Sequence, residues 1–393
     1  MRIAIVSDYF LDYVGGAQTS MLQQERALRS AGHEVVIVAP SRTSTGEQNR
    51  FRIPHLFTAP GVQLPVVANS SRTRTRLRNL FRERAIQAVH VQTEFGLAHA
   101  AAQVAHELGL PVVHTVHTFY WVSEGVGHRL AAGPLRAALR LLTGVAPERM
   151  QLSPRGVDNV LRNTTLAMAR TADVVISPSA HQAADLRSAG VPGPIHVVPN
   201  PMVGTNAPAA PLSEDLISHP VILWVARCEA VKRPLVFAEA AVQALRARPG
   251  RFSVHFVGDG SELAALRRTV EGHPTIHVHG ALDHDAVLAM IDRSSLVALT
   301  SVGFDNQPMT IAEAVSRDRG VLYCDPKLQE GLGRAGLLAP QPSSEALAHT
   351  LIRLVDEPAL IPGLSEGARA DKHLFGAAAY VAAVEKLYVG SNA

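Results

Sequence analysis

Cysteine is nearly absent from this chain of 393 residues, which holds only Cys228 and Cys324. Two thiols are too few for a cysteine metal cage, and each lies in or beside an apolar run. We therefore expect two buried free thiols, the usual state in a reducing cytoplasm. Aromatic residues are also scarce, at 5% beside a hydrophobic fraction of 47%, and this favours α/β layers packed with Ala, Leu and Val.

Long apolar runs and a strong excess of one charge are missing too. No run approaches the roughly 20 apolar residues of a transmembrane helix. The first residues, Met1 to Val6, turn polar at Ser7 and Asp8, so the apolar centre of a signal peptide is lacking. The formal net charge of +3 gives no reason to expect nucleic acid as a partner. These features predict a protein of the cytoplasm, or one that works at the inner face of the membrane.

What the chain does contain is a repeated alternation of short apolar runs and helical patterns, interrupted by a Pro-rich stretch at 199–211. Strands separated by helices favour parallel sheets. We predict two doubly wound α/β domains facing each other across a cleft, at 1–202 and 213–366, with a linker at 203–212 and a C-terminal helix in 367–393 that packs back on the first domain. The predicted strands are 3–6, 35–38, 88–91, 111–113, 174–176, 221–225, 254–257, 276–278, 296–299 and 320–323.

Two carboxylates stand eight residues apart in the second predicted domain, Asp305 before the sequence Asn306-Gln307-Pro308 and Glu313 in a helical pattern. A strand, a polar loop and a helix place free N–H groups and a positive dipole end at the carboxyl edge of the sheet, where ligands bind in such folds. The two acids could hold two hydroxylated parts of one ligand, such as a sugar joined through phosphates to a ribose. Taken alone, a helix cap and a surface ion pair are the simpler interpretation.

Gly15-Gly16, after the first strand, is one place where the backbone could approach a phosphate. The loop does not match G-x-G-x-x-G, and the strand at 35–38 runs into Ala39 and Pro40 without an acidic residue, which counts against a nicotinamide dehydrogenase. An ordinary turn remains an alternative.

Arg227 and Lys232 follow the strand at 221–225. An Arg fork and a Lys point charge at a strand end can bracket a diphosphate. Solvated loop cations remain the alternative.

Taken in order, a Gly-Gly loop, a His-rich strand end, Arg-x4-Lys, Gly258-Asp259-Gly260 and Asp305-x7-Glu313 resemble the retaining nucleotide-sugar glycosyltransferases of family 4. In that family an E-x7-E motif stands at the place of Asp305-x7-Glu313. An Arg/Lys pair stands as far upstream of that motif as Arg227 and Lys232 stand here. The resemblance runs from Ile3 to about Leu387 and implies the GT-B fold of two Rossmann-like domains.

The resemblance also implies a site for a UDP- or GDP-linked hexose as donor substrate, with no metal or other cofactor. Gly16, beside Gly15, would offer its N–H to the β-phosphate, while Arg227 and Lys232 would neutralise the leaving diphosphate. Glu313 would hold the ribose and Asp305 the transferred sugar. The remaining residues that the resemblance places at the donor are His117 beside the sugar, and Gly258, Asn306, Gln307, Pro308, Met309 and Thr310. A hydrogen-bonded histidine at a strand end remains an alternative for His117.

Three positions depart from the family pattern. Asp305 is one methylene shorter than the usual Glu, and Asn200-Pro201 replaces Asn-Gly. The turn at 316–320 replaces a Gly followed by a Pro, which leaves the base open.

The segments at 90–95 and 110–120 resemble the branch that includes diacylglycerol glucosyltransferases. A helix at 72–84 would place Leu77, Leu80 and Phe81 among six arginines, a composition suited to an anionic membrane surface. The residues predicted at the acceptor or membrane are Arg72, Arg74, Arg76, Arg78 and Tyr120. A solvated basic helix is the alternative. A lipid acceptor, a soluble or polysaccharide acceptor, and a nucleotide-sugar epimerase of the same fold all remain open.

Overall fold

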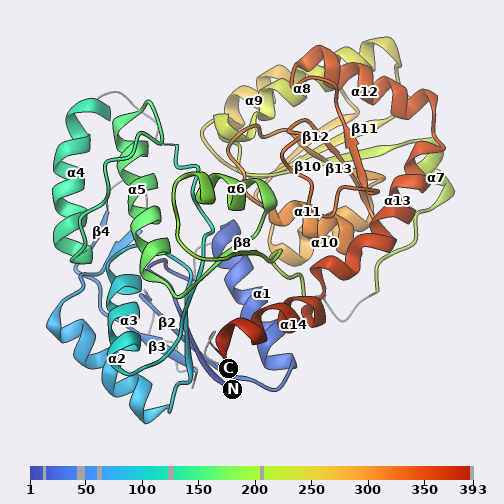
Figure 1. Cartoon of the computed structure of the whole chain (residues 1–393). Helices are drawn as coiled ribbons and strands as arrows, with labels where there is room; N and C mark the ends of the chain where they lie inside the picture. Colours follow the sequence, from blue (N-terminus) through green and yellow to red (C-terminus); the bar gives the residue numbers. More distant parts are fainter. Residues whose placement is uncertain (12–14, 42–48, 60–63, 123–127, 204–207, 390–393) are drawn as a thin grey trace. The chain divides into compact units, whose positions relative to one another are not determined.

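The computed structural model describes the chain except for residues 12–14, 42–48, 60–63, 123–127, 204–207 and 390–393 (Figure 1). Internal contacts divide it into two compact units, Met1–Pro201 with Ala377–Ala393, and Met202–Gly376. The middle of the predicted linker, 204–207, lies outside the described residues.

Unit 1 is built on a parallel sheet in the order β3-β2-β1-β6-β7-β8-β9. Its five inner strands, β1, β2, β6, β7 and β8, are almost fully buried and rich in Val, Ile and Ala, as expected for a sheet covered on both faces. The strand order reverses its direction between β1 and β6, so the loops after these strands flank a topological switch point. The strands are β1 (Arg2–Val6), β2 (Glu34–Ala39), β3 (Arg50–Arg52), β6 (Ala88–Val91), β7 (Val112–Thr115), β8 (Val174–Ser177) and β9 (Ile195–Val197), with a separate antiparallel pair β4 (Phe57–Ala59) and β5 (Leu64–Val66).

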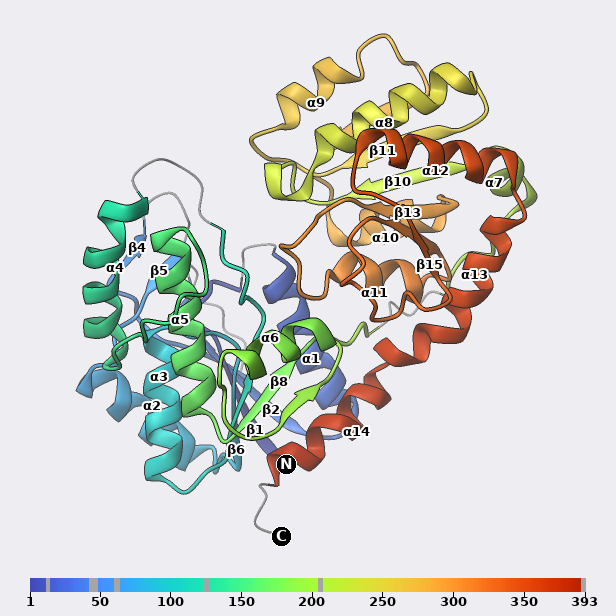
Figure 2. The ribbon, with the colours of Figure 1, turned by 45° about the horizontal axis from the view of Figure 1, so that its top comes forward.

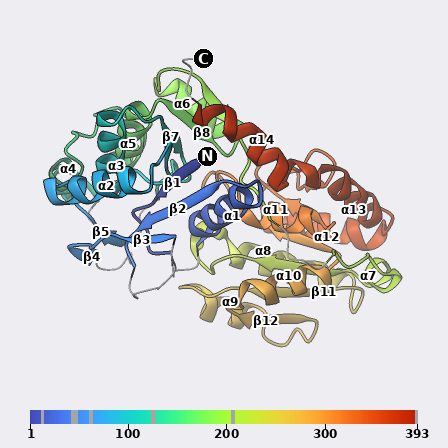
Figure 3. The ribbon, with the colours of Figure 1, turned by 90° about the horizontal axis from the view of Figure 1, so that it is seen from below.

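Helices cover both faces of this sheet (Figure 3). The Ala-rich α3 packs with α2 on the face that carries Val89 and Val91. The C-terminal helix α14 lies beside α1 (Figures 1 and 2), and its Tyr388 hydroxyl contacts His90, which faces the other way. The helices are α1 (Gly16–Ser30), α2 (Ser71–Glu83), α3 (Gly96–Glu107), α4 (His128–Thr143), α5 (Gly156–Thr171), α6 (Ala180–Ser188) and α14 (Ala377–Tyr388).

Unit 2 repeats this plan with a parallel sheet in the order β12-β11-β10-β13-β14-β15. The order reverses between β10 and β13, where the Trp224 indole N–H donates to Thr300 Oγ1 at 2.9 Å. The strands are β10 (Val221–Val225), β11 (Ser253–Val257), β12 (Ile276–Gly280), β13 (Leu296–Leu299), β14 (Gly320–Tyr323) and β15 (Gly336–Leu338).

The helices of unit 2 also form two layers. α8, α9 and α12 enclose one core, and α10, α11 and α13 enclose the other (Figure 2). The helices are α7 (Glu214–Ser218), α8 (Pro234–Ala247), α9 (Leu263–Thr269), α10 (His284–Asp292), α11 (Met309–Ser316), α12 (Ser344–Asp356) and α13 (Leu360–Asp371), with short 3-10 turns η1 (Ala230–Lys232) and η2 (Lys372–Phe375).

The predicted class of two parallel α/β sheets is confirmed. The C-terminal helix predicted in 367–393 is α14, which begins only at Ala377 because the chain breaks between α13 and α14. Phe375 is buried in the core of unit 2 and its carbonyl accepts from Met202 N–H at 2.7 Å. Gly376 is extended, with ψ 148°, and ends the helical path.

Candidate functional site

The switch point of unit 2 brings together two predicted site residues. Lys232 ends η1 after β10, and Asp305 lies in the loop after β13. The Lys232 ammonium forms an ion pair with Asp305 Oδ1, and the Ser301 hydroxyl donates to Asp305 Oδ2. Both charged side chains are largely enclosed. A cation and an anion are therefore held at fixed positions on the carboxyl edge of the sheet.

Arg227 follows β10, and Gly258 follows β11, which is the neighbour of β10 in the sheet. Arg227 is exposed. Gly258 has φ +142°, and a Cβ there would lie 1.8 Å from the carbonyl oxygen of Ala226. Only glycine allows the two loops to approach this closely. The geometry thus gives Gly258 a packing role, and its contact with a donor stays a prediction.

Helix α11 begins at Met309, directly after Pro308, and its first turn faces the same sheet edge. Asn306 and Gln307 are buried in the loop before it, and the Thr310 hydroxyl donates to the carbonyl of Val225 at 3.4 Å. The first N–H groups of a helix lack partners within the helix and carry its positive dipole end. This terminus suits an anionic or hydroxylated ligand.

Glu313 lies inside α11 and is only 7% exposed. Burial raises the pKa of its carboxyl from the usual 4.5 to about 7. Its nearest ionisable neighbour is His284, the first residue of α10, with Nδ1 3.6 Å from Glu313 Oε1. His284 was not predicted from the sequence. Its place just after β12, behind the helix-capping Asp283, was the available signal.

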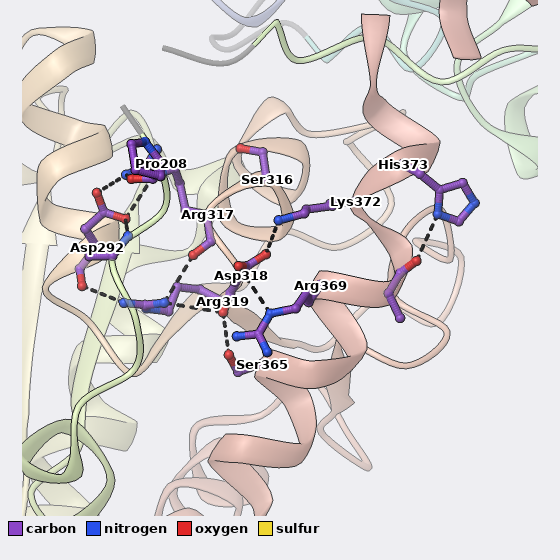
Figure 4. A network of polar contacts seen from close by, with 12 residues as sticks. Pro208, Asp292, Ser316, Arg317, Asp318, Arg319, Ser365, Arg369, Lys372 and His373 are labelled. Carbon is purple, nitrogen blue, oxygen red and sulfur yellow. Dashed lines mark hydrogen bonds and ion pairs between the residues drawn. The ribbon is translucent and has the colours of Figure 1, made fainter. Parts of the chain in front are cut away.

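The turn that departs from the family pattern is held by charges (Figure 4). Arg319 is fully buried and donates to the carbonyl oxygens of Ser294 and Asp292, both at 2.7 Å. Asp318 adopts φ +56° and forms an ion pair with Lys372 at 3.0 Å. Arg317 forms an ion pair with Asp292. Carbonyl and carboxylate oxygens thus bond to the charged side chains of this turn, which lacks the family's Gly and Pro.

In unit 1, the predicted Gly-Gly loop and histidine both lie at the carboxyl edge of the sheet. Gly15 precedes α1 and Gly16 begins it, and a Cβ at Gly16 would meet nothing within 4 Å. His117 follows β7 and is partly exposed, with Nε2 2.6 Å from Gln92 Oε1. Desolvation lowers the pKa of His117 from 6.5 to about 4, so its ring is neutral at pH 7.

Tyr120, the residue predicted at the acceptor, is buried. Its hydroxyl donates to Asp185 Oδ2 at 2.7 Å, and its ring stacks on His181. The contact of Tyr120 with an acceptor stays a prediction.

The four arginines of α2 differ in their surroundings. Arg72 and Arg76 are exposed, whereas Arg74 donates to Asn69 at 2.9 Å and Arg78 pairs with Glu107. The apolar part of the predicted membrane face requires a correction. All three of its apolar side chains are buried in the core of unit 1 and do not lie on the surface with the arginines: Leu77, Leu80 and Phe81.

Both cysteines are buried free thiols, as predicted, and burial raises the pKa of each to about 11. None of the helices within the described ranges has the length and apolarity needed to cross a bilayer. Over the same ranges, no three or more His, Cys, Asp or Glu side chains are grouped so that they could hold a metal ion.

Two family models match the chain. Residues 14–202 match Glycosyltransferase Family 4, and residues 219–357 match Glycosyl transferases group 1. The chain is 22% identical to the alpha-monoglucosyldiacylglycerol synthase of Acholeplasma laidlawii over 408 aligned residues, which cover 99% of this chain and 97% of that protein. It is 24% identical to the phosphatidyl-myo-inositol mannosyltransferase of Mycolicibacterium smegmatis over 408 aligned residues, which cover 99% and 93%.

Solved structures show the same fold. The sucrose-phosphate synthase of Thermosynechococcus elongatus matches with TM-score 0.66 at 18% identity, over 99% of this chain and 98% of that one. HepE of Anabaena, solved with UDP, matches with TM-score 0.66 at 14% identity, over 98% and 99%. The chain belongs to the family 4 glycosyltransferases of the GT-B fold, which transfer a sugar from a nucleotide-sugar donor.

Proposed function

We propose that this protein is a retaining hexosyltransferase that moves a sugar from UDP- or GDP-hexose to a hydroxyl of a membrane lipid. The observation that carries the proposal is the enclosed Lys232–Asp305 pair at the switch point of unit 2, beside the start of α11 with its buried Glu313. The lipid acceptor is supported by the two relatives that align over nearly the whole chain, a diacylglycerol-lipid glucosyltransferase and a phosphatidylinositol mannosyltransferase by name. The acceptor class is a diacylglycerol, phosphoinositide or related glycolipid.

The donor roles are those that the resemblance to the family implies. Glu313 accepts hydrogen bonds from the ribose hydroxyls, and Asp305 accepts them from the hexose. Arg227 and Lys232 hold the diphosphate, with the N–H of Gly16 on the β-phosphate. Asn306, Gln307, Met309 and Thr310 line the approach to the sugar and phosphates.

The reaction needs stabilisation of one leaving group. The bond between the anomeric carbon and the diphosphate oxygen breaks while Lys232 and Arg227 neutralise the departing charge. The acceptor hydroxyl attacks the same face of the sugar, its oxygen bonds to the anomeric carbon, and its proton passes to the leaving phosphate. No side chain serves as a nucleophile in this scheme, and the two cations do the electrostatic work without a metal.

A donor panel tests the function. Thermal shift with UDP-, GDP-, ADP- and dTDP-hexoses selects the donor, and the selected donor is then incubated with diacylglycerol vesicles, phosphatidylinositol vesicles or soluble sugars. We expect a lipid product with the donor's anomeric configuration and an unchanged rate in EDTA. An inverted product would contradict retention, and loss of activity in EDTA would contradict metal independence. Conversion of the donor's sugar without any acceptor would instead indicate an epimerase.

Membrane attachment through α2 has its own test, because the arginines divide into two matched pairs. The Arg72→Gln/Arg76→Gln variant should bind anionic vesicles more weakly than the wild type, with a loss of binding free energy of about 1 kcal/mol per exposed arginine removed. Arg74→Gln/Arg78→Gln should have the smaller effect, since these two arginines already bond to Asn69 and Glu107. Vesicle co-sedimentation at two salt concentrations measures both. Equal binding of the wild type to neutral and anionic vesicles would mean that α2 is a solvated basic helix that does not bind the membrane.

A further inference from the structure

The C-terminal helix α14 is joined to His117 by a chain of side-chain hydrogen bonds inside unit 1. The Tyr380 hydroxyl donates to Gln24 Oε1 at 2.8 Å. Gln92 Nε2 donates to the same oxygen at 2.9 Å, and Gln92 Oε1 lies 2.6 Å from His117 Nε2. Three helices or loops far apart in the sequence therefore meet at one amide, that of Gln24.

Which group donates and which accepts in these hydrogen bonds is set by Ser20 and Asn200, at the end of the hydrogen-bond chain opposite to His117. Gln24 Nε2 donates to Ser20 Oγ at 3.1 Å, and the Ser20 hydroxyl donates to Asn200 Oδ1 at 2.6 Å. With its nitrogen facing Ser20, Gln24 turns its oxygen toward Tyr380 and Gln92. Gln92 must then direct its nitrogen to that oxygen and its own oxygen to His117.

An amide oxygen accepts hydrogen bonds and cannot donate them, so His117 Nε2 must be the donor. The neutral ring then carries its proton on Nε2, which leaves Nδ1 as the acceptor. Reversing the Gln92 amide alone would set its oxygen against the oxygen of Gln24. Gln24, Gln92 and Tyr380 are each at most 3% exposed, so water cannot relieve such a mismatch.

The ionisable neighbours do not disturb this arrangement. His90 on β6 and His114 on β7 are the histidines that interact electrostatically with His117, and burial lowers the pKa of both to about 3. Both rings are neutral at pH 7. The tautomer of His117 thus depends on the hydrogen-bond chain rather than on a nearby charge.

We propose that Ser20, Gln24 and Gln92 position His117 in the Nε2–H tautomer, with Tyr380 of α14 donating to the same Gln24 oxygen, so that Nδ1 accepts a hydrogen bond from a hydroxyl of the bound sugar substrate. The contact with substrate rests on the proposed function, whereas the tautomer does not. Ser20, Gln24 and Gln92 are positioning residues, because they act through His117.

The test begins with selective ¹⁵N-histidine labelling and NMR of the ring nitrogens, assigned by the signal lost in His117→Gln. Wild type should show a protonated Nε2 and a bare Nδ1. Ser20→Ala removes the acceptor that orients the Gln24 amide and should yield a mixture of tautomers, with kcat lowered about tenfold and the donor KM little changed. Gln92→Glu places a carboxylate against Nε2–H and should raise the pKa of His117 by about 1–3 units, which moves the acid limb of the kcat profile by the same amount.

Ser30→Ala is the matched control. It removes a serine hydroxyl from the same helix as Ser20, α1, but this hydroxyl donates to the carbonyl of Ala27 at 2.7 Å and not to Gln24. We expect the wild-type tautomer and kcat in this variant. A protonated Nδ1 in wild type, or an unchanged tautomer and kcat in Ser20→Ala, would overturn the proposal. If no donor is turned over, the proposed function fails while the NMR result still decides the tautomer.

Discussion

Replacing Lys232 by alanine is expected to lower kcat by about 10²–10³-fold, the usual cost of removing one group that stabilises transition-state charge. The ammonium lies at the switch point of unit 2 and is held there by Asp305. The charge it neutralises grows as the diphosphate departs, so the loss should fall on kcat more than on the donor KM. Steady-state kinetics with the donor selected by the panel measure both constants.

Two controls separate the possible causes of this loss. Lys372→Ala removes a lysine that also pairs with an aspartate, Asp318 at 3.0 Å, in a turn away from the sheet edge, and should leave the rate unchanged. Lys232→Ala/Asp305→Asn removes the carboxylate that the single variant leaves unpaired. If the double variant regains the wild-type rate, the stranded carboxylate and not the missing cation caused the loss. A near-native rate in Lys232→Ala itself would refute the assigned role.

The long buried strands were predictable because their apolar runs are continuous. The strands at 88–91, 221–225, 296–299 and 320–323 have the predicted bounds in the structure. The edge strands β9 and β15 were missed, because Ile195–Val197 and Gly336–Leu338 are short and only partly apolar. Such strands are defined by the neighbour that pairs with them, and this pairing is invisible in a local pattern.

The break before α14 was missed as well. The residues from Gly367 to Tyr388 favour a helix except for Gly367 and Gly376, and Gly376, where the helical path ends, was the available signal. The core of unit 2 binds Phe375, while Tyr380 and Tyr388 bond to side chains of unit 1.

At the candidate site, the sequence predicted Lys232 and Asp305 each after a strand, and the structure shows that these strands, β10 and β13, are neighbours and joins the two residues in an ion pair. The partners that tune the site were not predictable in this way. Ser301, His284 and Gln92 carry no motif, and each becomes relevant only through one distance in the folded chain. The apolar residues of α2 were misplaced because an amphipathic pattern does not reveal whether its apolar side faces a core or a membrane.

Glu313→Gln is expected to make the protein more stable and a poorer binder of nucleotide. The folded-state pKa of Glu313, about 7, exceeds the usual 4.5, so the folded protein holds a proton between these values that the unfolded chain has lost. The free energy of unfolding of the wild type therefore falls as pH rises from about 4.5 to 7, by about 3 kcal/mol in all. Glutamine stays neutral, so the variant should be about 3 kcal/mol more stable at pH 8 and equal to wild type at pH 4. Urea denaturation at the two pH values measures the difference.

The cost of this buried charge is explained if the carboxylate binds the ribose, because a desolvated anion accepts strong hydrogen bonds from hydroxyl groups. The variant should bind the selected nucleoside diphosphate about 10–100-fold more weakly, and wild-type affinity should fall as pH drops below about 7 and the carboxylate takes up a proton. Calorimetric titration tests both, with Glu239→Gln, an exposed glutamate on α8, as the control that should match wild type in stability and affinity. Unchanged affinity in Glu313→Gln would remove Glu313 from the nucleotide site, and an absent stability gain at pH 8 would mean that the carboxylate is solvated in the folded protein. A gain in stability together with a loss of affinity is the pattern expected of a residue kept for binding at the expense of folding.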